Sequence, residues 1–95
     1  MAPIFAWNPR KAAAYNAKHG VSFDEAATIF MDPLARIFDD IWNAGGEVRQ
    51  IAIGHSASQR LLVVCYREVN STLRIISARR ATRTERADYE EETGD

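Results

Sequence analysis

The sequence predicts an α+β fold in which an antiparallel β-sheet carries helices packed on one face. Helix signals are grouped near the two ends of the chain, and between them apolar residues follow the patterns of strands. Only short polar turns separate the central strands, and strands joined by such turns pair antiparallel. The expected order is therefore β-α-α-β-β-β-β-α, and the 95 residues have room for one domain, residues 1–95.

The first strand and the first helix are marked by residue type. The apolar and aromatic segment 3–7 is typical of an edge strand. Asn8-Pro9 then starts a helix, because asparagine is a good N-cap and proline suits the first helical position. We expect this helix over about residues 9–18, ended by the glycine that follows His19. Lys18 and His19 lie where the helix dipole favours cations, which explains them without catalysis.

A second helix begins at a capping box. Ser22 and Glu25 stand three residues apart, and such a pair satisfies free amide groups in the first helical turn. Apolar residues recur at helical spacing over about residues 23–31, and Asp32-Pro33 ends the pattern.

Four strands follow the second helix. The third of them is almost continuously apolar, as expected for a central strand covered on both faces at least in part. The segment before the second carries turn residues, and the later connections are short and polar. The expected strands span about residues 34–38, 47–54, 60–67 and 73–79.

The stretch 73–86 joins the last strand to the last helix and is rich in arginine. Thr82 and Glu85 form another capping box, which predicts a helix over about residues 82–92. Guanidinium groups stay charged and bind phosphate bidentately, so a local cationic patch is expected in a chain of net charge −1. The alternative is ordinary surface charge paired with nearby carboxylates. The arginines are Arg74, Arg79, Arg80, Arg83 and Arg86.

Composition limits the function classes. The single cysteine, Cys65, cannot form an internal disulfide, which fits a reducing cytoplasm. The two histidines stand in unrelated contexts, so a zinc site is not expected. No cofactor is predicted. No apolar run reaches membrane-spanning length, and the N-terminus does not resemble a signal peptide.

The polar residues predicted on the sheet suit cleavage of RNA. Attack of a ribose 2′-hydroxyl on the adjacent phosphate needs a base, cations around the phosphorane and an acid for the leaving oxygen. Glu47 could be the base and the arginines the cationic clamp. The alternative is structural pairing of Glu47 with arginines across the sheet. The proton donor could be Lys18, His19, His55 or Tyr89.

Several sequence blocks resemble the BrnT family, small ribonuclease toxins of bacterial type II toxin–antitoxin systems with a RelE-like fold. The match is collinear from Trp7 to Tyr89, and the blocks KHGVSF-x-EA and RIISAR are the most specific. The blocks are Lys18–Ala26, Asp32-Pro33, Gly46–Arg49, Ile51–Gly54, Arg60–Val64 and Arg74–Ala81, with Glu85 and Tyr89 after them.

The resemblance implies a twisted antiparallel sheet and an endoribonuclease that works without metal and inhibits translation. It also implies a BrnA-like antitoxin in a hetero-oligomer, with operator DNA bound only through the antitoxin. The residues that it suggests for catalysis, with individual roles as hypotheses, are Lys18, His19, Glu47, Arg49, Arg79 and Arg80. For RNA binding it suggests Arg60 and Arg74, and the pattern of polar residues on the last helix adds Arg83 and Tyr89.

The sequence also departs from the family pattern. Asn8 and Tyr15 replace an expected Asp and Asn, and Asn43 stands where relatives often have a histidine. If that histidine is the general acid in relatives, this chain has lost it or uses another donor. A second hypothesis is therefore a catalytically weak or silent module that binds the antitoxin and tunes repression of the operon.

Overall fold

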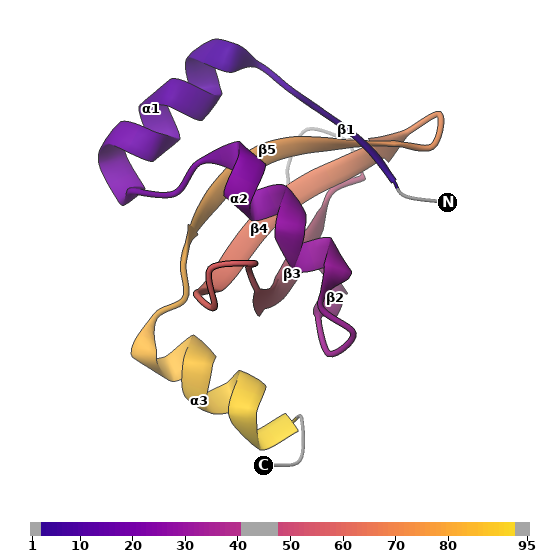
Figure 1. Ribbon diagram of the computed structural model, residues 1–95. Helices are drawn as coiled ribbons and strands as arrows, with labels where there is room; N and C mark the ends of the chain where they lie inside the picture. The colour runs from indigo at the N-terminus through magenta and orange to yellow at the C-terminus, as the bar shows by residue number, and fades with distance from the viewer. Residues whose placement is uncertain (1–2, 41–47, 93–95) are drawn as a thin grey trace.

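The computed structural model describes residues 3–40 and 48–92, and within them it confirms the α+β class (Figure 1). One mixed sheet carries helices on both of its faces. The elements are β1 (Ile4–Trp7), α1 (Pro9–His19), α2 (Phe23–Ala27), the 3₁₀ turn η1 (Thr28–Met31), β2 (Arg36–Asp39), β3 (Gln50–His55), β4 (Leu61–Val69), β5 (Thr72–Arg80) and α3 (Arg83–Glu92).

The strand order in the sheet is β1-β5-β4-β3-β2. The four strands from β2 to β5 pair antiparallel, as predicted from the short turns between them. β1 lies at the edge, as expected, but it pairs parallel with β5, which makes the sheet mixed. No short turn joins β1 to the next strand, because two helices lie between them. Antiparallel pairing therefore could not be predicted for β1 in the way it was for the other strands.

The predicted helix starts and stops are present. The Asn8 side chain accepts hydrogen bonds from the backbone amides of Arg10 and Lys11, and Gly20 ends α1 with a positive φ of 68°. Glycine adopts that conformation most readily because it has no Cβ, so Gly20 is well suited to end the helix.

The main core lies between one face of the sheet and the helices α1 and α2. Phe23 and Ile29 pack there against Leu62 and Val64 of β4, and all four are fully buried. Figure 1 shows α2 lying across this face of the sheet.

Helix α3 packs on the opposite face, which differs from the prediction of all helices on one face. Tyr89 of α3 forms a second buried cluster with Ile53 and Leu61. Leu61 and Leu62 are neighbours on β4 and point to opposite faces, and both are buried. This end of the sheet therefore requires cover on both sides, and α3 supplies it. We call the face that α1 and α2 leave uncovered the open face.

No helix in the described ranges is long and apolar enough to span a membrane.

Candidate functional site

Three arginines of β4 and β5 lie on the open face. Arg74 is directly opposite Arg67 in the antiparallel pair, and Arg79 is five residues further along β5. The intervening positions Ile75 and Ala78 are buried in the core under α1 and α2. The pairing shifts by one residue opposite Cys65 and Tyr66, so Arg79 returns to the face of Arg74 although five residues separate them. Arg74 and Arg79 each adjoin one of the buried positions, and cross-strand partners share a face, so the three guanidinium groups emerge on the other side.

Arg49 lies near the same surface. Cys65 is half-buried in the middle of β4, and burial is the main cause that raises the pKa of its thiol. Asp40 also raises this pKa and Arg49 lowers it, so both charges lie close to the thiol. Of the predicted residues, the structure thus brings Arg49, Arg74 and Arg79 to the open face.

The guanidinium of Arg79 binds a carboxylate in the first turn of α3. Its Nη1 and Nη2 donate to the two carboxylate oxygens of Glu85 at 2.7 and 2.8 Å. These bonds lower the pKa of Glu85 from its ordinary 4.5 to about 2. Glu85 also accepts from the Thr82 amide at 2.8 Å, which completes the predicted capping box. Arg79 therefore anchors α3 across the end of β5.

A second group of predicted residues surrounds Glu25, near the end of α1. Arg60 forms an ion pair with the Glu25 carboxylate, and its Nη2 donates to the carbonyl oxygen of Gly20 at 2.9 Å. Ser56 donates its hydroxyl to Glu25 at 2.7 Å. The bonds from Arg60 and Ser56 lower the pKa of Glu25, against burial, which raises it. Arg60 thus links the β3–β4 turn to the α1–α2 connection.

The other predicted cations lie around this group or on α3. Arg80 is exposed, and its charge is among those that lower the pKa of Glu25. Lys18 and His19 form the last turn of α1, where the His19 ring stacks on Tyr15 with the centroids 5.8 Å apart. Arg83 is exposed at the start of α3.

The predicted constellation is therefore divided between the two sides of the sheet. Glu47, the predicted base, and Asn43 lie outside the described residues. Among residues 3–40 and 48–92, no three His, Cys, Asp or Glu side chains are grouped as metal ligands.

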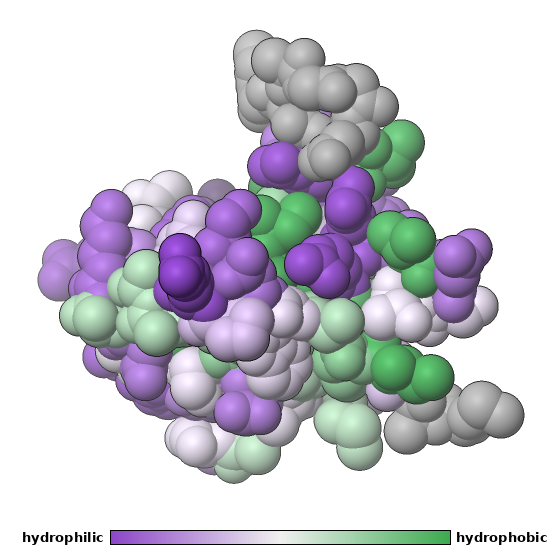
Figure 2. Space-filling view, turned by 90° about the horizontal axis from the view of Figure 1, so that it is seen from above, coloured by the Kyte–Doolittle hydropathy of each residue, from purple (hydrophilic) through white to green (hydrophobic). Residues whose placement is uncertain are grey.

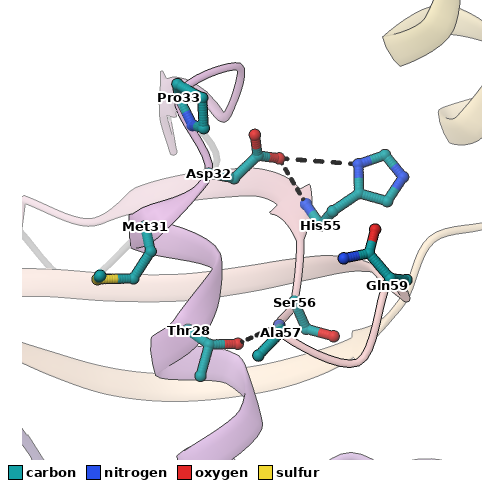
Figure 3. A pocket seen from close by; sticks show the side chains of 8 residues that line it. All are labelled: Thr28, Met31, Asp32, Pro33, His55, Ser56, Ala57 and Gln59. Carbon is teal, nitrogen blue, oxygen red and sulfur yellow. Dashed lines mark hydrogen bonds and ion pairs between the residues drawn. The ribbon is translucent and has the colours of Figure 1, made fainter.

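Asp32 organises a polar cluster that the sequence did not predict. It lies beside a cavity of about 720 Å³ between η1 and the β3–β4 turn (Figure 3). Its Oδ2 accepts from the His55 amide at 2.8 Å and from the Tyr89 hydroxyl at 3.1 Å, and the His55 ring Nδ1 is 3.7 Å away. Burial alone would raise the pKa of Asp32, but the hydrogen bonds from His55, Leu34 and Tyr89 lower it.

Tyr89 was predicted to bind RNA, and the structure gives it a packing role. Its side chain is 4% exposed, and its hydroxyl donates to Asp32. In the sequence, Asp32-Pro33 indicated the end of a helix and formed one block of the family resemblance, but nothing assigned a role to the Asp32 carboxylate. Nothing in local spacing connects Asp32 with His55 and Tyr89, which come from distant parts of the chain.

Comparisons with known proteins agree with this fold. Residues 7–85 match the family described as ribonuclease toxin, BrnT, of type II toxin-antitoxin system. The crystal structure of the Brucella abortus ribonuclease toxin BrnT is similar, with a TM-score of 0.64 and 25% sequence identity. The match covers 84% of this chain and 99% of the Brucella chain. No curated protein matches the chain. Because the family match covers most of its length, the chain belongs to the BrnT family of ribonuclease toxins of type II toxin–antitoxin systems.

Proposed function

We propose that the chain is an endoribonuclease that cleaves RNA without metal and inhibits translation in the cytoplasm. Residues 1–95 act as one toxin domain, neutralised by a BrnA-like antitoxin in a hetero-oligomer that binds operator DNA only through the antitoxin. The observation that carries this proposal is the position of Arg49, Arg74 and Arg79 near the open face of the sheet. Guanidinium groups on one surface suit a polyanionic strand.

The proposed chemistry is attack of a ribose 2′-hydroxyl on the neighbouring phosphate. Glu47 takes the proton from the hydroxyl, and Arg49 stabilises the negative charge that develops on the phosphorane. The proton for the leaving oxygen comes from one of the predicted donors, of which Lys18 and His19 lie on the covered side of the sheet and His55 lies beside Tyr89 on the face that α3 packs against. Arg79 and Arg80 complete the proposed catalytic set.

The remaining predicted residues extend the proposed RNA surface beyond the cleavage point. Positively charged residues along a groove hold the backbone of a single strand with little sequence preference. They would therefore set affinity more than rate. These proposed contacts are Arg60, Arg74 and Arg83, whereas Tyr89 belongs to the buried cluster under α3.

The test is RNA cleavage by the purified protein in EDTA, with growth measured after the chain is induced alone in bacteria. We expect growth arrest and cleavage from the parent. Glu47→Gln should lower the cleavage rate by about 100-fold or more, the usual contribution of a general base. Glu91→Gln is the matched control, because Glu91 is exposed on α3. A Glu47→Gln variant that cleaves as fast as the parent would remove Glu47 from the site.

A second candidate function is a catalytically silent module that binds the antitoxin and tunes repression by the complex. It is favoured by the ion pairs of Arg60 with Glu25 and of Arg79 with Glu85, which give two predicted site arginines structural partners. A folded parent that leaves RNA intact and growth unchanged, yet binds antitoxin, would favour this candidate. Asn43→His would then be the next variant to assay.

A further inference from the structure

We propose that the open cavity at the β4–β5 hairpin binds a phosphodiester group of a single-stranded RNA, away from the point of cleavage. This inference rests on the proposed function, because RNA is the ligand. We call the cavity the hairpin subsite. It has a volume of about 400 Å³ and is lined by Ala6, Arg67, Val69, Asn70, Thr72 and Arg74.

The pairing register of the sheet brings two arginines together in the subsite and leaves space beside them. Arg74 lies between Ala6 of β1 and Arg67 of β4, so the three residues form one row across three strands. Like charges directly opposite each other destabilise a pair of strands, and an anion between them would remove that repulsion. The small side chain of Ala6 leaves room beside Arg74 for a bound group.

The two arginines differ in the interactions that their guanidinium groups already make. In the part of the chain that the structure describes, no hydrogen bond or ion pair involves the guanidinium of Arg74, which is exposed. Arg67 is partly buried and already engaged in the folded chain. Arg79, at the other end of β5, is occupied by Glu85. Arg74 is therefore the cation of the open face that is best placed to take a phosphate, and Arg67 adds to its field.

A tight turn forms the rim of the subsite. Asn70 and Ser71 are the two residues between β4 and β5, and both have positive φ values, 51° and 66°. This conformation matches the twist of the flanking strands and gives a short, well-defined hairpin. The Asn70 amide and the Thr72 hydroxyl add polar groups to the lining. Figure 2, a view from above Figure 1, shows a largely hydrophilic surface with separate hydrophobic patches.

The subsite implies a strand as ligand rather than a free phosphate. Arg74 and Arg79 are five residues apart on β5, roughly 17 Å at the usual rise of a strand. A ligand that spans the open face must therefore extend over several nucleotides. We expect the subsite to contribute mainly to binding.

The test measures binding of a fluorescent 2′-O-methyl RNA strand, which lacks the attacking hydroxyl, beside cleavage of the unmodified strand. Arg74→Gln should weaken binding about tenfold, as expected for loss of a charge-assisted contact. It should also make the slope of log affinity against log salt shallower by about 0.7, the value for one phosphate contact on a single strand. Arg67→Gln should act in the same direction with a smaller effect.

Arg10→Gln is the matched control, because Arg10 is exposed on α1 and loses the same charge on the covered side of the sheet. It should bind like the parent. Arg74→Gln should fold at least as well as the parent, since it removes a like-charge pair, so weaker binding cannot be ascribed to unfolding.

The outcomes separate this inference from the proposed function. A parent that binds and cleaves RNA while Arg74→Gln and Arg67→Gln both bind like Arg10→Gln overturns the hairpin subsite alone. A folded parent that neither binds nor cleaves RNA overturns the proposed function and the subsite together. Inorganic phosphate that competes as well as the strand does, at equal phosphate concentration, would also overturn the strand-binding role.

Discussion

Glu85 is a residue whose single carboxylate stabilises two parts of the fold. It closes the capping box of α3 with Thr82, and it holds the guanidinium of Arg79 on β5. The capping box could be predicted because its spacing is local in sequence. The contact with Arg79 could not, because it depends on how the chain turns between β5 and α3.

Glu85→Gln should lower the free energy of unfolding at pH 7 by about 1 kcal/mol, after allowance for solvent screening of a pair that is one-third exposed. The pKa of Glu85 is lowered from 4.5 to about 2 on folding. Its contribution is therefore complete above pH 4.5 and is lost as the pH falls toward 2. Urea unfolding of parent and variant from pH 7 to pH 2 should show a difference that narrows below pH 4.5.

The control for this experiment is Glu91→Gln, a change of the same charge at an exposed position of α3. It should leave stability nearly unchanged at every pH. A Glu85→Gln variant with the same deficit at pH 7 and pH 2 would mean that the ion pair is not the source of the effect.

At the scale of elements, the ends of α1 and the start of α3 followed from capping residues, because these signals act within one helical turn. The parallel pairing of β1 with β5 joins segments about 70 residues apart, and no local signal specifies it. The position of α3 on the open face depends on a single buried tyrosine in an otherwise polar helix. One buried residue, Tyr89, gives too weak a hydrophobic pattern to predict which face of the sheet the helix covers.

The contact between β3 and the turn before β2 can be tested at Gly54. This glycine is buried, and an added Cβ would lie 2.9 Å from the Cβ of Ala35 and 3.3 Å from Oδ2 of Asp32. Gly54→Ala should therefore destabilise the protein by about 1–3 kcal/mol, the usual cost of overpacking. Thermal and urea unfolding measure the change.

Ala35→Gly is the compensating substitution for Gly54→Ala, because it removes the Cβ atom of Ala35, which lies closest to the added methyl group. The double variant should recover part of the stability lost in Gly54→Ala. If Gly54→Ala is as stable as the parent, the strand and the turn are not in close contact. If the rescue fails, the neighbouring Asp32 carboxylate is the obstacle.

At the scale of the whole molecule, charge is separated although the net charge is −1. Arginines gather on the open face, whereas the outer side of α3 is rich in carboxylates. The sequence predicted a local cationic patch from the arginines of 73–86. It could not predict that Arg67, outside that stretch, lies opposite Arg74, because strand register depends on the packing of the sheet. It also could not predict that Arg80 lies near Glu25, apart from the others.

This separation of charge predicts a salt dependence that net charge alone would not. If Arg49, Arg67 and Arg74 each neutralise one phosphate, the slope of log affinity against log salt should be about −2 for a single strand. Affinity for the 2′-O-methyl strand should then fall roughly twentyfold between 50 and 200 mM salt. If only the net negative charge of the protein governed binding, the protein and RNA would repel each other, and added salt would screen this repulsion. Affinity would then stay constant or rise with the salt concentration. A flat or rising affinity in this range would therefore contradict an arginine-lined RNA surface.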